Sequence, residues 1–211
     1  MEPIKATDRL FIVGPTGTGK TTLMAQFVRQ LPAHWTTFGI DPKPARDMRT
    51  MFPRTLKRPE QISTFQGRGR IHQPTFARGA YDPFLEAIWQ RQRCTLVIDD
   101  LRLVMLHGST DHLESLLVAG RERQIGVWSS MQRPIDLLEL ITEAEWIVSF
   151  GLQMKKDRMR MGERGFDADE AYAKLVGDHD YFVHRRGWKE PMFPLSRIPP
   201  KKERMRKHVT R

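Results

Sequence analysis

The sequence predicts an α/β fold in which a mainly parallel sheet forms the middle of three layers, between two layers of helices. Short apolar segments typical of buried parallel strands alternate along the chain with segments of helical periodicity. The clearest apolar segments are residues 10–13, 94–98, 125–131 and 145–152. A glycine-rich turn follows the first of them and two acids follow the second. Both positions belong to the carboxyl edge of a parallel sheet, where open α/β proteins bind their ligands.

The length and cysteine content of the chain favour a single intracellular domain. Its 211 residues suit one domain with a sizeable core. No apolar segment approaches the roughly 18 residues that a membrane-spanning helix needs, and the first residues lack the pattern of a signal peptide. Cys94 is the only cysteine, so no intramolecular disulfide can form, and its place at the start of an apolar strand predicts a buried thiol. We therefore expect a soluble intracellular protein.

The chain carries an excess of positive charge. It has 35 lysines and arginines against 25 acidic residues, a formal net charge of +10. This excess favours a polyanionic partner, with nucleic acid ahead of an acidic membrane; a generally basic surface is the alternative. Half of the charge lies in residues 201–211, where six basic residues accompany one acid. We expect residues 1–197 to form the domain and residues 198–211 to form a mobile basic tail.

The glycine-rich turn after residues 10–13 fits the P-loop pattern of Gly, four residues and Gly-Lys-Ser/Thr. Its glycines allow the backbone to approach phosphate oxygens, and its amides then point at an anion bound at the start of a helix predicted for residues 22–31. Lys20 is expected to reach the β- and γ-phosphates, and the Thr21 hydroxyl is expected to bind Mg²⁺. ATP or another NTP is the expected ligand. The predicted nucleotide-binding residues are Gly14, Pro15, Thr16, Gly17, Thr18, Gly19, Lys20, Thr21 and Thr22.

A pair of acids follows the apolar strand predicted for residues 94–98. This strand comes after a predicted helix that has Asp82 as its cap and Pro83 at its first position. Asp99 and Asp100 end the strand and therefore lie at the ligand edge of the sheet. This is the form of a Walker B segment, in which Asp99 binds Mg²⁺ directly or through water and Asp100 orients and deprotonates the attacking water. The alternative is that either acid caps a helix.

Two further polar positions follow predicted strands. A strand over residues 34–40 ends in an Asp-Pro-Lys-Pro sequence that begins at Asp41. Asp41 either contributes to the ligand crevice or forms a turn. A strand over residues 125–131 ends at Gln132. Its amide either holds the lytic water or senses the γ-phosphate, or it is an ordinary polar strand end.

The remaining segments give weaker signals. Residues 45–70 are basic and broken by prolines, and residues 67–70 are expected to form a flexible basic loop that either contacts a phosphate backbone or is simply solvated. Ser109 is expected to cap a helix, and Asp167 with Glu170 predicts a capping box. The seven histidines are scattered and predict no metal cluster. The further elements expected are helices over residues 109–124, 134–140 and 167–176 and a strand over residues 181–184.

The order of these segments resembles the FtsK/HerA superfamily of DNA-pumping ATPases. In that superfamily a helix end of Gly-Arg-x-x-Gly-Ile type precedes a strand that finishes in Thr-Gln-Arg-Pro. This chain has Gly-Arg-Glu-Arg-Gln-Ile-Gly from Gly120 and Met-Gln-Arg-Pro from Met131. The resemblance covers roughly residues 8–150 and implies the RecA-like (ASCE) form of the P-loop NTPase fold. Because the chain is short and basic, it is most similar to the genome-packaging ATPases of tailless, membrane-containing icosahedral viruses and phages.

This resemblance implies an enzyme that couples ATP hydrolysis to the packaging of double-stranded DNA into a preformed capsid. The implied cofactors are ATP and Mg²⁺, and the implied assembly is a homo-oligomeric ring, usually a hexamer. A capsid vertex or an inner membrane protein is a further implied partner, so the protein is expected in the host cytoplasm and at the packaging vertex of the virion. DNA would be gripped through its phosphates without base reading. The residues expected to do so are Arg68, Arg70, Lys155, Lys156 and Arg158.

The resemblance also implies roles for individual residues. Gln132 would be the sensor at the end of its strand. Arg121 or Arg123 would be the arginine finger that reaches the γ-phosphate of a neighbouring subunit, or else both are cations that stabilise a helix end. An isolated monomer would then be nearly inactive. The chain departs from the superfamily at Asp100, where glutamate is usual, and at Met131, where threonine is usual; the shorter Asp100 carboxylate has less reach.

Two alternative functions fit the same motifs. The first is a cellular DNA translocase or helicase of the same superfamily, although the chain lacks the accessory domains of the large members. The second is a nucleotide-switched phage assembly protein similar to zonula occludens toxin, although such proteins usually carry a membrane span. DNA-stimulated ATP turnover separates a motor from a switch.

Overall fold

An eight-stranded sheet forms the centre of the computed structural model, in which residues 3–43, 45–72, 78–106, 111–134 and 142–194 are described. The strands lie in the order β3-β4-β2-β5-β6-β1-β7-β8, and all neighbouring pairs are parallel except β7 and β8. The predicted α/β fold with a mainly parallel central sheet is confirmed. The strands are β1 (Arg9–Val13), β2 (Thr37–Ile40), β3 (Arg54–Leu56), β4 (Arg68–Ile71), β5 (Cys94–Ile98), β6 (Ile125–Met131), β7 (Trp146–Phe150) and β8 (Tyr181–Arg185).

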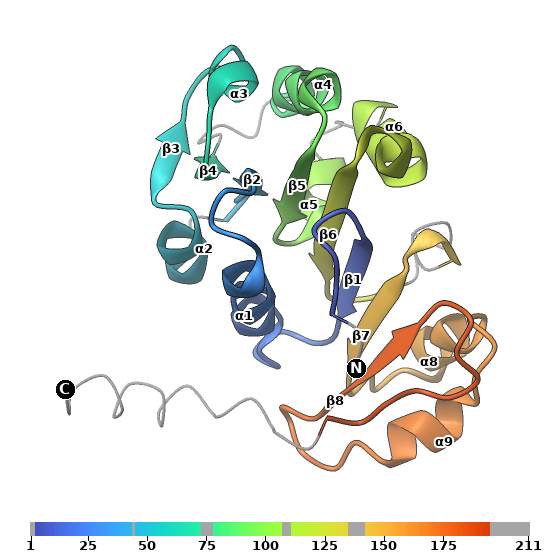
Figure 1. Ribbon diagram of the computed structural model, residues 1–211. Coiled ribbons are helices and arrows are strands. Elements are labelled where there is room, and N and C mark those ends of the chain that lie inside the picture. The colour runs from blue at the N-terminus through green and yellow to red at the C-terminus, as the bar shows by residue number, and fades with distance from the viewer. Residues whose placement is uncertain (1–2, 44, 73–77, 107–110, 135–141, 195–211) are drawn as a thin grey trace.

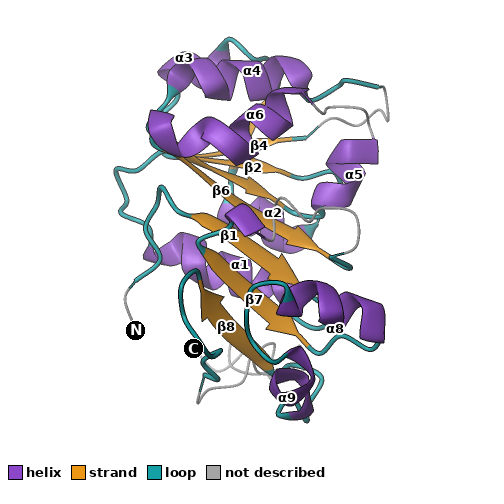
Figure 2. Cartoon of the chain, turned by 90° about the vertical axis from the view of Figure 1, so that its right-hand side faces the viewer, coloured by secondary structure: helices purple, strands orange, loops and turns teal. Residues whose placement is uncertain are grey.

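Helices cover both faces of this sheet (Figures 1 and 2). The helices α1 and α2 pack on one face, whereas α4, α5, α6, α8 and α9 pack on the other. No helix within the described ranges is both long and apolar enough to cross a lipid bilayer. The helices are α1 (Lys20–Gln30), α2 (Arg46–Met51), α3 (Gln61–Thr64), α4 (Asp82–Arg91), α5 (Leu101–Leu106), α6 (Asp111–Ala119), the 3₁₀ turn η1 (Gly120–Arg123), α8 (Lys155–Gly162) and α9 (Ala168–Ala173).

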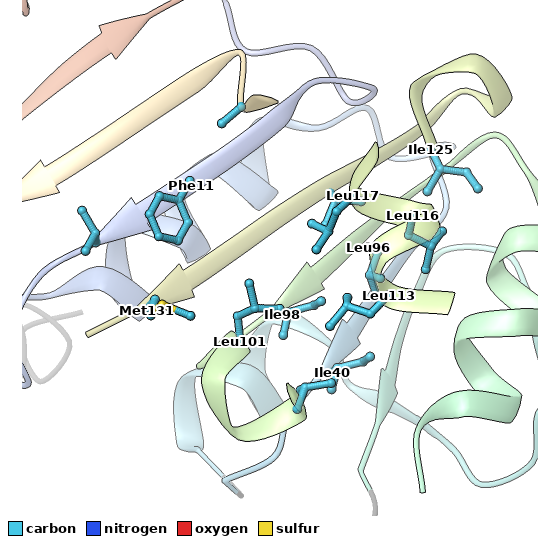
Figure 3. Close-up of a cluster of buried hydrophobic side chains, with 14 of the residues drawn as sticks. Phe11, Ile40, Leu96, Ile98, Leu101, Leu113, Leu116, Leu117, Ile125 and Met131 are labelled. Carbon is cyan, nitrogen blue, oxygen red and sulfur yellow. The ribbon is translucent and has the colours of Figure 1, made fainter. Parts of the chain in front are cut away.

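The central strands are apolar throughout because both faces of the sheet are covered. In β1, Leu10 and Ile12 join the core under α1, while Phe11 and Val13 join the core on the opposite face. Figure 3 shows this second core, where side chains of β1, β5 and β6 meet leucines of α5 and α6. Cys94 is fully buried in it, as the sequence predicts. This packing fixes the strand ends from which the candidate site is built.

The structure corrects the reading of residues 45–70. Residues 67–70 are not a flexible loop: Arg68 to Ile71 form β4, which pairs in parallel with both β2 and β3. Its burial alternates, because the two arginines are half-buried while Gly69 and Ile71 are fully covered. A Cβ atom at Gly69 would lie 2.7 Å from Leu56 Cδ1. Gly69 therefore leaves room for the Leu56 side chain to pack over β4.

Several helix ends also differ from the prediction. Asp82 is the first residue of α4 rather than its cap, which is Tyr81 and makes no side-chain capping bond. The predicted helix over 109–124 consists of α6 and the tighter turn η1. The Asp167 half of the predicted capping box is confirmed, because its carboxylate accepts the Glu170 amide at 2.9 Å. The Glu170 carboxylate accepts Lys174 at 2.7 Å instead, and α9 ends at Ala173. The predicted cap Ser109, residues 135–140 of the predicted helix 134–140 and the predicted tail 198–211 lie outside the described residues.

Candidate active site

The P-loop connects β1 to α1 at the carboxyl edge of the sheet. Gly17 and Gly19 have φ angles of 87° and 102°, in the left-handed region that favours glycine. A Cβ atom at Gly14 would lie 2.6 Å from Phe150 Cβ, so glycine is needed there for close packing against β7. The first turn of α1 contains no acidic residue. The positive end of its dipole is therefore available to an anion.

Lys20 bends back over this loop. Its Nζ donates hydrogen bonds to the carbonyl oxygens of Gly14 and Pro15, at 2.7 and 2.8 Å. Burial lowers the pKa of Lys20, while the carboxylates of Asp99 and Asp100 act in the opposite direction. The loop thus holds an ammonium group beside the amides that would bind phosphate.

Asp99 lies directly beside the start of α1. Its Oδ1 accepts hydrogen bonds from Thr21 Oγ1 at 3.1 Å and from Ser130 Oγ at 2.9 Å. Burial raises the pKa of Asp99, and these two hydroxyl groups partly offset the effect. The role of Ser130 was not foreseen; the available signal was a polar residue next to the end of an apolar strand.

The residues around Asp99 fit a magnesium ion. A hydroxyl and a carboxylate oxygen lie together, and these are the hard ligands that Mg²⁺ takes up alongside substrate phosphates. In the described part of the chain, no cluster of three or more His, Cys, Asp or Glu side chains could hold a metal. A site completed by nucleotide phosphates needs only one or two protein carboxylates. Thr21 and Asp99 are therefore the residues that could hold the ion.

Asp100 has an unusual backbone conformation at the end of β5. Its φ angle is 64°, in the left-handed region, and its amide donates to Ser130 Oγ at 3.1 Å. Such conformations in non-glycine residues are uncommon and cluster at functional sites. Its carboxylate forms an ion pair with Lys43, with Nζ and Oδ2 2.5 Å apart. The sequence offered no sign of this pair.

Asp41 both forms a turn and lies at the ligand edge, so the two readings of this residue are compatible. Its side chain is fully buried, and its Oδ1 accepts the Ala45 amide at 3.3 Å. Its other carboxylate oxygen has no hydrogen-bond partner among the described residues, and burial raises its pKa. His72 Nδ1 lies 2.8 Å from the Asp41 carbonyl oxygen. These contacts hold Asp41 in place, two residues before Lys43.

Gln132 lies at the same edge, immediately after β6. The Gly14 amide donates to the carbonyl oxygen of Met131 at 3.2 Å, which places Gln132 next to the P-loop. Its side chain is exposed and has no hydrogen-bond partner within the described ranges. The next residue, Arg133, donates to the buried carboxylate of Asp157 at 3.0 Å. Arg133 therefore anchors the segment that presents Gln132.

The two candidate finger arginines lie at the opposite edge of the sheet, just before β6 begins. Arg121 forms an ion pair with Glu145 at 3.1 Å, but its side chain remains 62% exposed. Arg123 donates to the Trp89 carbonyl oxygen at 3.0 Å, and its guanidinium lies 4.6 Å from the centre of the Trp89 ring. The structure therefore does not bring either arginine to the P-loop of its own chain.

A pocket of about 760 Å³ opens beside the outer side of the P-loop. One wall is residues 15–18, and the other walls are residues 151–153 and parts of residues 169–179. His179 Nδ1 lies 2.9 Å from the Thr18 carbonyl oxygen, so the C-terminal segment contacts the P-loop directly. The volume lies in the range of small-molecule sites. Sequence reasoning missed this pocket, because its two sides are far apart along the chain.

The residues expected to contact DNA are not equivalent. Arg68 donates to the Val28 carbonyl oxygen and Arg70 to the Thr55 hydroxyl, both at 2.9 Å. Arg158 donates to the carbonyl oxygens of Leu152 and Gln153 beside the pocket. Lys155 and Lys156, at the start of α8, are exposed, and their ammonium groups have no ion-pair partner in the part of the chain described here.

No protein-family model and no curated protein sequence matches the chain. Among solved structures, the fold is similar to the genome-packaging NTPase B204 of Sulfolobus turreted icosahedral virus 2. The TM-score is 0.74 at 16% identity for its complex with ATP-gammaS and 0.72 at 18% identity for its complex with AMP. Both comparisons cover 93% of this chain and 100% of that chain.

A second similar structure is the cytoplasmic domain of the Type VII secretion ATPase EccC of Thermomonospora curvata, with a TM-score of 0.61 at 13% identity. It covers 92% of this chain and 26% of that one. At identities this low, the structural similarity establishes the fold alone. The chain therefore has the P-loop NTPase fold that viral genome-packaging NTPases share, as the sequence resemblance implies.

Proposed function

We propose that the protein hydrolyses ATP and uses the energy to package double-stranded DNA into a preformed viral capsid. The observation that carries this proposal is the meeting of the P-loop, Asp99, Asp100 and Gln132 at one sheet edge. The full-length similarity to a viral genome-packaging NTPase supports it further.

The phosphates of ATP lie in the P-loop. Its amides and Lys20 hold the β- and γ-phosphates, while Thr21 and Asp99 hold the magnesium ion. The ion, when bound, neutralises charge on the phosphates. Asp100 accepts the proton of the attacking water and Gln132 orients that water. Ser130 supports both acids, because its hydroxyl donates to Asp99 and accepts the Asp100 amide.

The pocket beside the P-loop receives the nucleoside. A nucleotide held by its phosphates must extend its ribose and base past the loop, and this pocket adjoins residues 15–18. Leu175 and Val176 supply an apolar wall against which a planar base can pack. The contact between His179 and Thr18 links this wall to the phosphate loop.

The finger is supplied by a neighbouring subunit of a ring. Arg121 suits this role better than Arg123, because its side chain is 62% exposed whereas Arg123 is tied to Trp89. Mixing two inactive variants tests the arrangement. Lys20→Ala and Arg121→Ala should each be inactive alone, and a mixture should regain activity where an intact P-loop meets an intact Arg121. No recovery in mixed rings would contradict a shared site.

DNA phosphates are bound without base reading. Lys155 and Lys156 are the better candidates, since both are exposed cations, whereas Arg68 is hydrogen-bonded to α1 and Arg70 to β3. Replacing both lysines with alanine should weaken DNA binding and reduce its salt dependence. Replacing Arg68 and Arg70 should have a smaller effect on binding.

The decisive test measures ATP turnover with and without double-stranded DNA. We expect DNA to stimulate turnover, and we expect Asp100→Asn to abolish the stimulated rate while ATP still binds. A turnover rate that DNA leaves unchanged would contradict a DNA motor and favour the nucleotide-switched assembly protein. Full activity of Asp100→Asn would contradict the role of Asp100 as base.

A further inference from the structure

The ion pair between Lys43 and Asp100 lies at the mouth of the candidate site. We infer that Lys43 is a γ-phosphate ligand, which the Asp100 carboxylate holds when no nucleotide is bound. This inference rests on the proposed ATPase function. It assigns a role to Lys43, which has none in that proposal. It makes the pair a sensor that distinguishes a nucleoside triphosphate from a diphosphate.

The strand order places Lys43 opposite Lys20. Strand β5, which carries the two acids, lies between β2, which leads to Lys43, and the β6–β1 pair, which leads to Lys20. The Asp99 amide donates to the Ile40 carbonyl oxygen at 3.2 Å, so the turn after β2 begins directly beside the acids. Two lysines therefore flank the acids from opposite sides, and only Lys20 belongs to the P-loop.

Asp41, two residues before Lys43, is held in place, while the Lys43 side chain can move. Asp41 is fully buried and accepts the Ala45 amide, and the Asp41 carbonyl oxygen contacts His72. The Lys43 side chain is 56% exposed, whereas that of Asp100 is 15% exposed. Lys43 is thus the partner that can leave the pair, because its side chain is flexible and is the more exposed of the two.

Charge balance gives the reason for the movement. Without nucleotide, Lys20 and Lys43 offset the two acids. A nucleoside triphosphate with one divalent cation adds net negative charge beside Asp100, and the phosphate becomes the stronger partner for the second ammonium group. Asp100 is then free to accept a proton from water. When the γ-phosphate leaves, Lys43 returns to Asp100.

Nucleotide binding tests this inference without relying on turnover. The affinities of a non-hydrolysable ATP analogue and of ADP, each with Mg²⁺, should be measured for the wild type and for Lys43→Ala. We expect the variant to bind the analogue about ten- to a hundredfold more weakly, the usual contribution of a charged hydrogen bond, and to bind ADP almost as the wild type does. Equal losses for both nucleotides, or no loss, would overturn the inference.

The Asp100→Asn variant provides a second, independent binding test. It releases Lys43, so the analogue should bind more tightly than to the wild type, and the gain should disappear in the Lys43→Ala/Asp100→Asn double variant. The same gain in the double variant would overturn the inference. Lys57→Ala is the matched control, because Lys57 is also exposed just after a strand but lies at β3, and it should leave both affinities unchanged. A wild-type protein that binds neither nucleotide would overturn the proposed function and this inference with it.

Discussion

The two edges of the central sheet use charge in different ways. At the amino edge, Arg9 is almost fully buried and donates to the Leu117 carbonyl oxygen at 2.8 Å, and Glu145 accepts both the Arg9 amide and Arg121. At the carboxyl edge, Lys20 is held by backbone carbonyl oxygens, and Asp100 pairs with Lys43 from a left-handed backbone conformation.

The difference separates charges that complete the fold from charges that await a ligand. The arginines and glutamates of the amino edge satisfy one another and join β1, β6 and β7. Burial of Asp99 at the carboxyl edge disfavours its charged form, which is a common property of functional sites. Substitutions at the two edges should therefore affect different quantities: folding stability for the buried charges of the amino edge, and ATP turnover at the carboxyl edge. The exposed Arg121 is the exception at the amino edge, because it is the proposed arginine finger.

The largest expected effect is on turnover, from Lys20→Ala. Removing a preorganised cation from a transition state of this kind costs about 10²–10³ in rate. The thermal midpoint without nucleotide should change little, because the partly buried Lys20 ammonium group hydrogen-bonds only to backbone carbonyl oxygens in the described part of the chain. Steady-state ATPase assays and thermal unfolding measure the two quantities. A large loss of stability would mean that the carboxyl edge is also a folding element.

The converse effect is expected from Arg9→Met at the amino edge. Removing this buried arginine leaves the Leu117 and Val118 carbonyl oxygens and Glu145 with fewer donors. Loss of one member of a buried pair costs about 3–5 kcal/mol. Urea unfolding measures the loss. Arg186→Met is the control: its ion pair with Glu143 is about half-exposed, so less than about 1 kcal/mol is expected. Equal losses would contradict the distinction between buried and exposed pairs.

The carboxyl edge was largely predictable from the sequence. The P-loop, Asp99, Asp100 and Gln132 each follow a segment that was recognisable as an apolar strand, and parallel pairing necessarily brings these strand ends together. The short strands β3 and β4 were not predicted, because their arginines indicated a solvated segment. Local sequence does not show that Gly69 packs under Leu56.

Contacts between distant residues could not be predicted. Lys43 meets Asp100, Arg133 meets Asp157, and His179 meets Thr18 across long stretches of chain. Each contact depends on the strand order and on the path of a connecting segment, which residue spacing does not determine. The same limit applies to the two candidate finger arginines. Sequence does not show that Arg121 pairs with Glu145 whereas Arg123 does not, and this difference becomes visible only in the fold.

A smaller stability effect, of opposite direction to that of Arg9, is expected for Asp99→Asn. Burial raises the pKa of Asp99 above its ordinary value of 3.8. The folded protein then keeps a proton at pH values where the unfolded chain has lost it, so stability falls as pH rises through the folded-state pKa. At neutral pH the uncharged asparagine should raise the thermal midpoint, while magnesium-dependent turnover is lost. A lower midpoint would show that the charge itself stabilises this edge.

The smallest expected effect is on the pH dependence of folding stability, from His184 at the amino edge. His184 on β8 pairs with Ile147 near the start of β7, and burial lowers its pKa below 6.5, helped by the nearby charge of Arg164. The unfolded chain therefore binds a proton that the folded protein does not, and stability falls as pH drops below 6.5, by at most about 1.4 kcal/mol per pH unit for one group. His184→Phe should flatten this slope in urea unfolding between pH 7 and pH 5, while the exposed His34→Gln should leave it unchanged. The pH dependence is opposite in sign to that of Asp99. A lower pH should therefore reduce the contribution of His184 to the free energy of unfolding and increase that of Asp99. A slope that survives in His184→Phe would assign the acid sensitivity to another group.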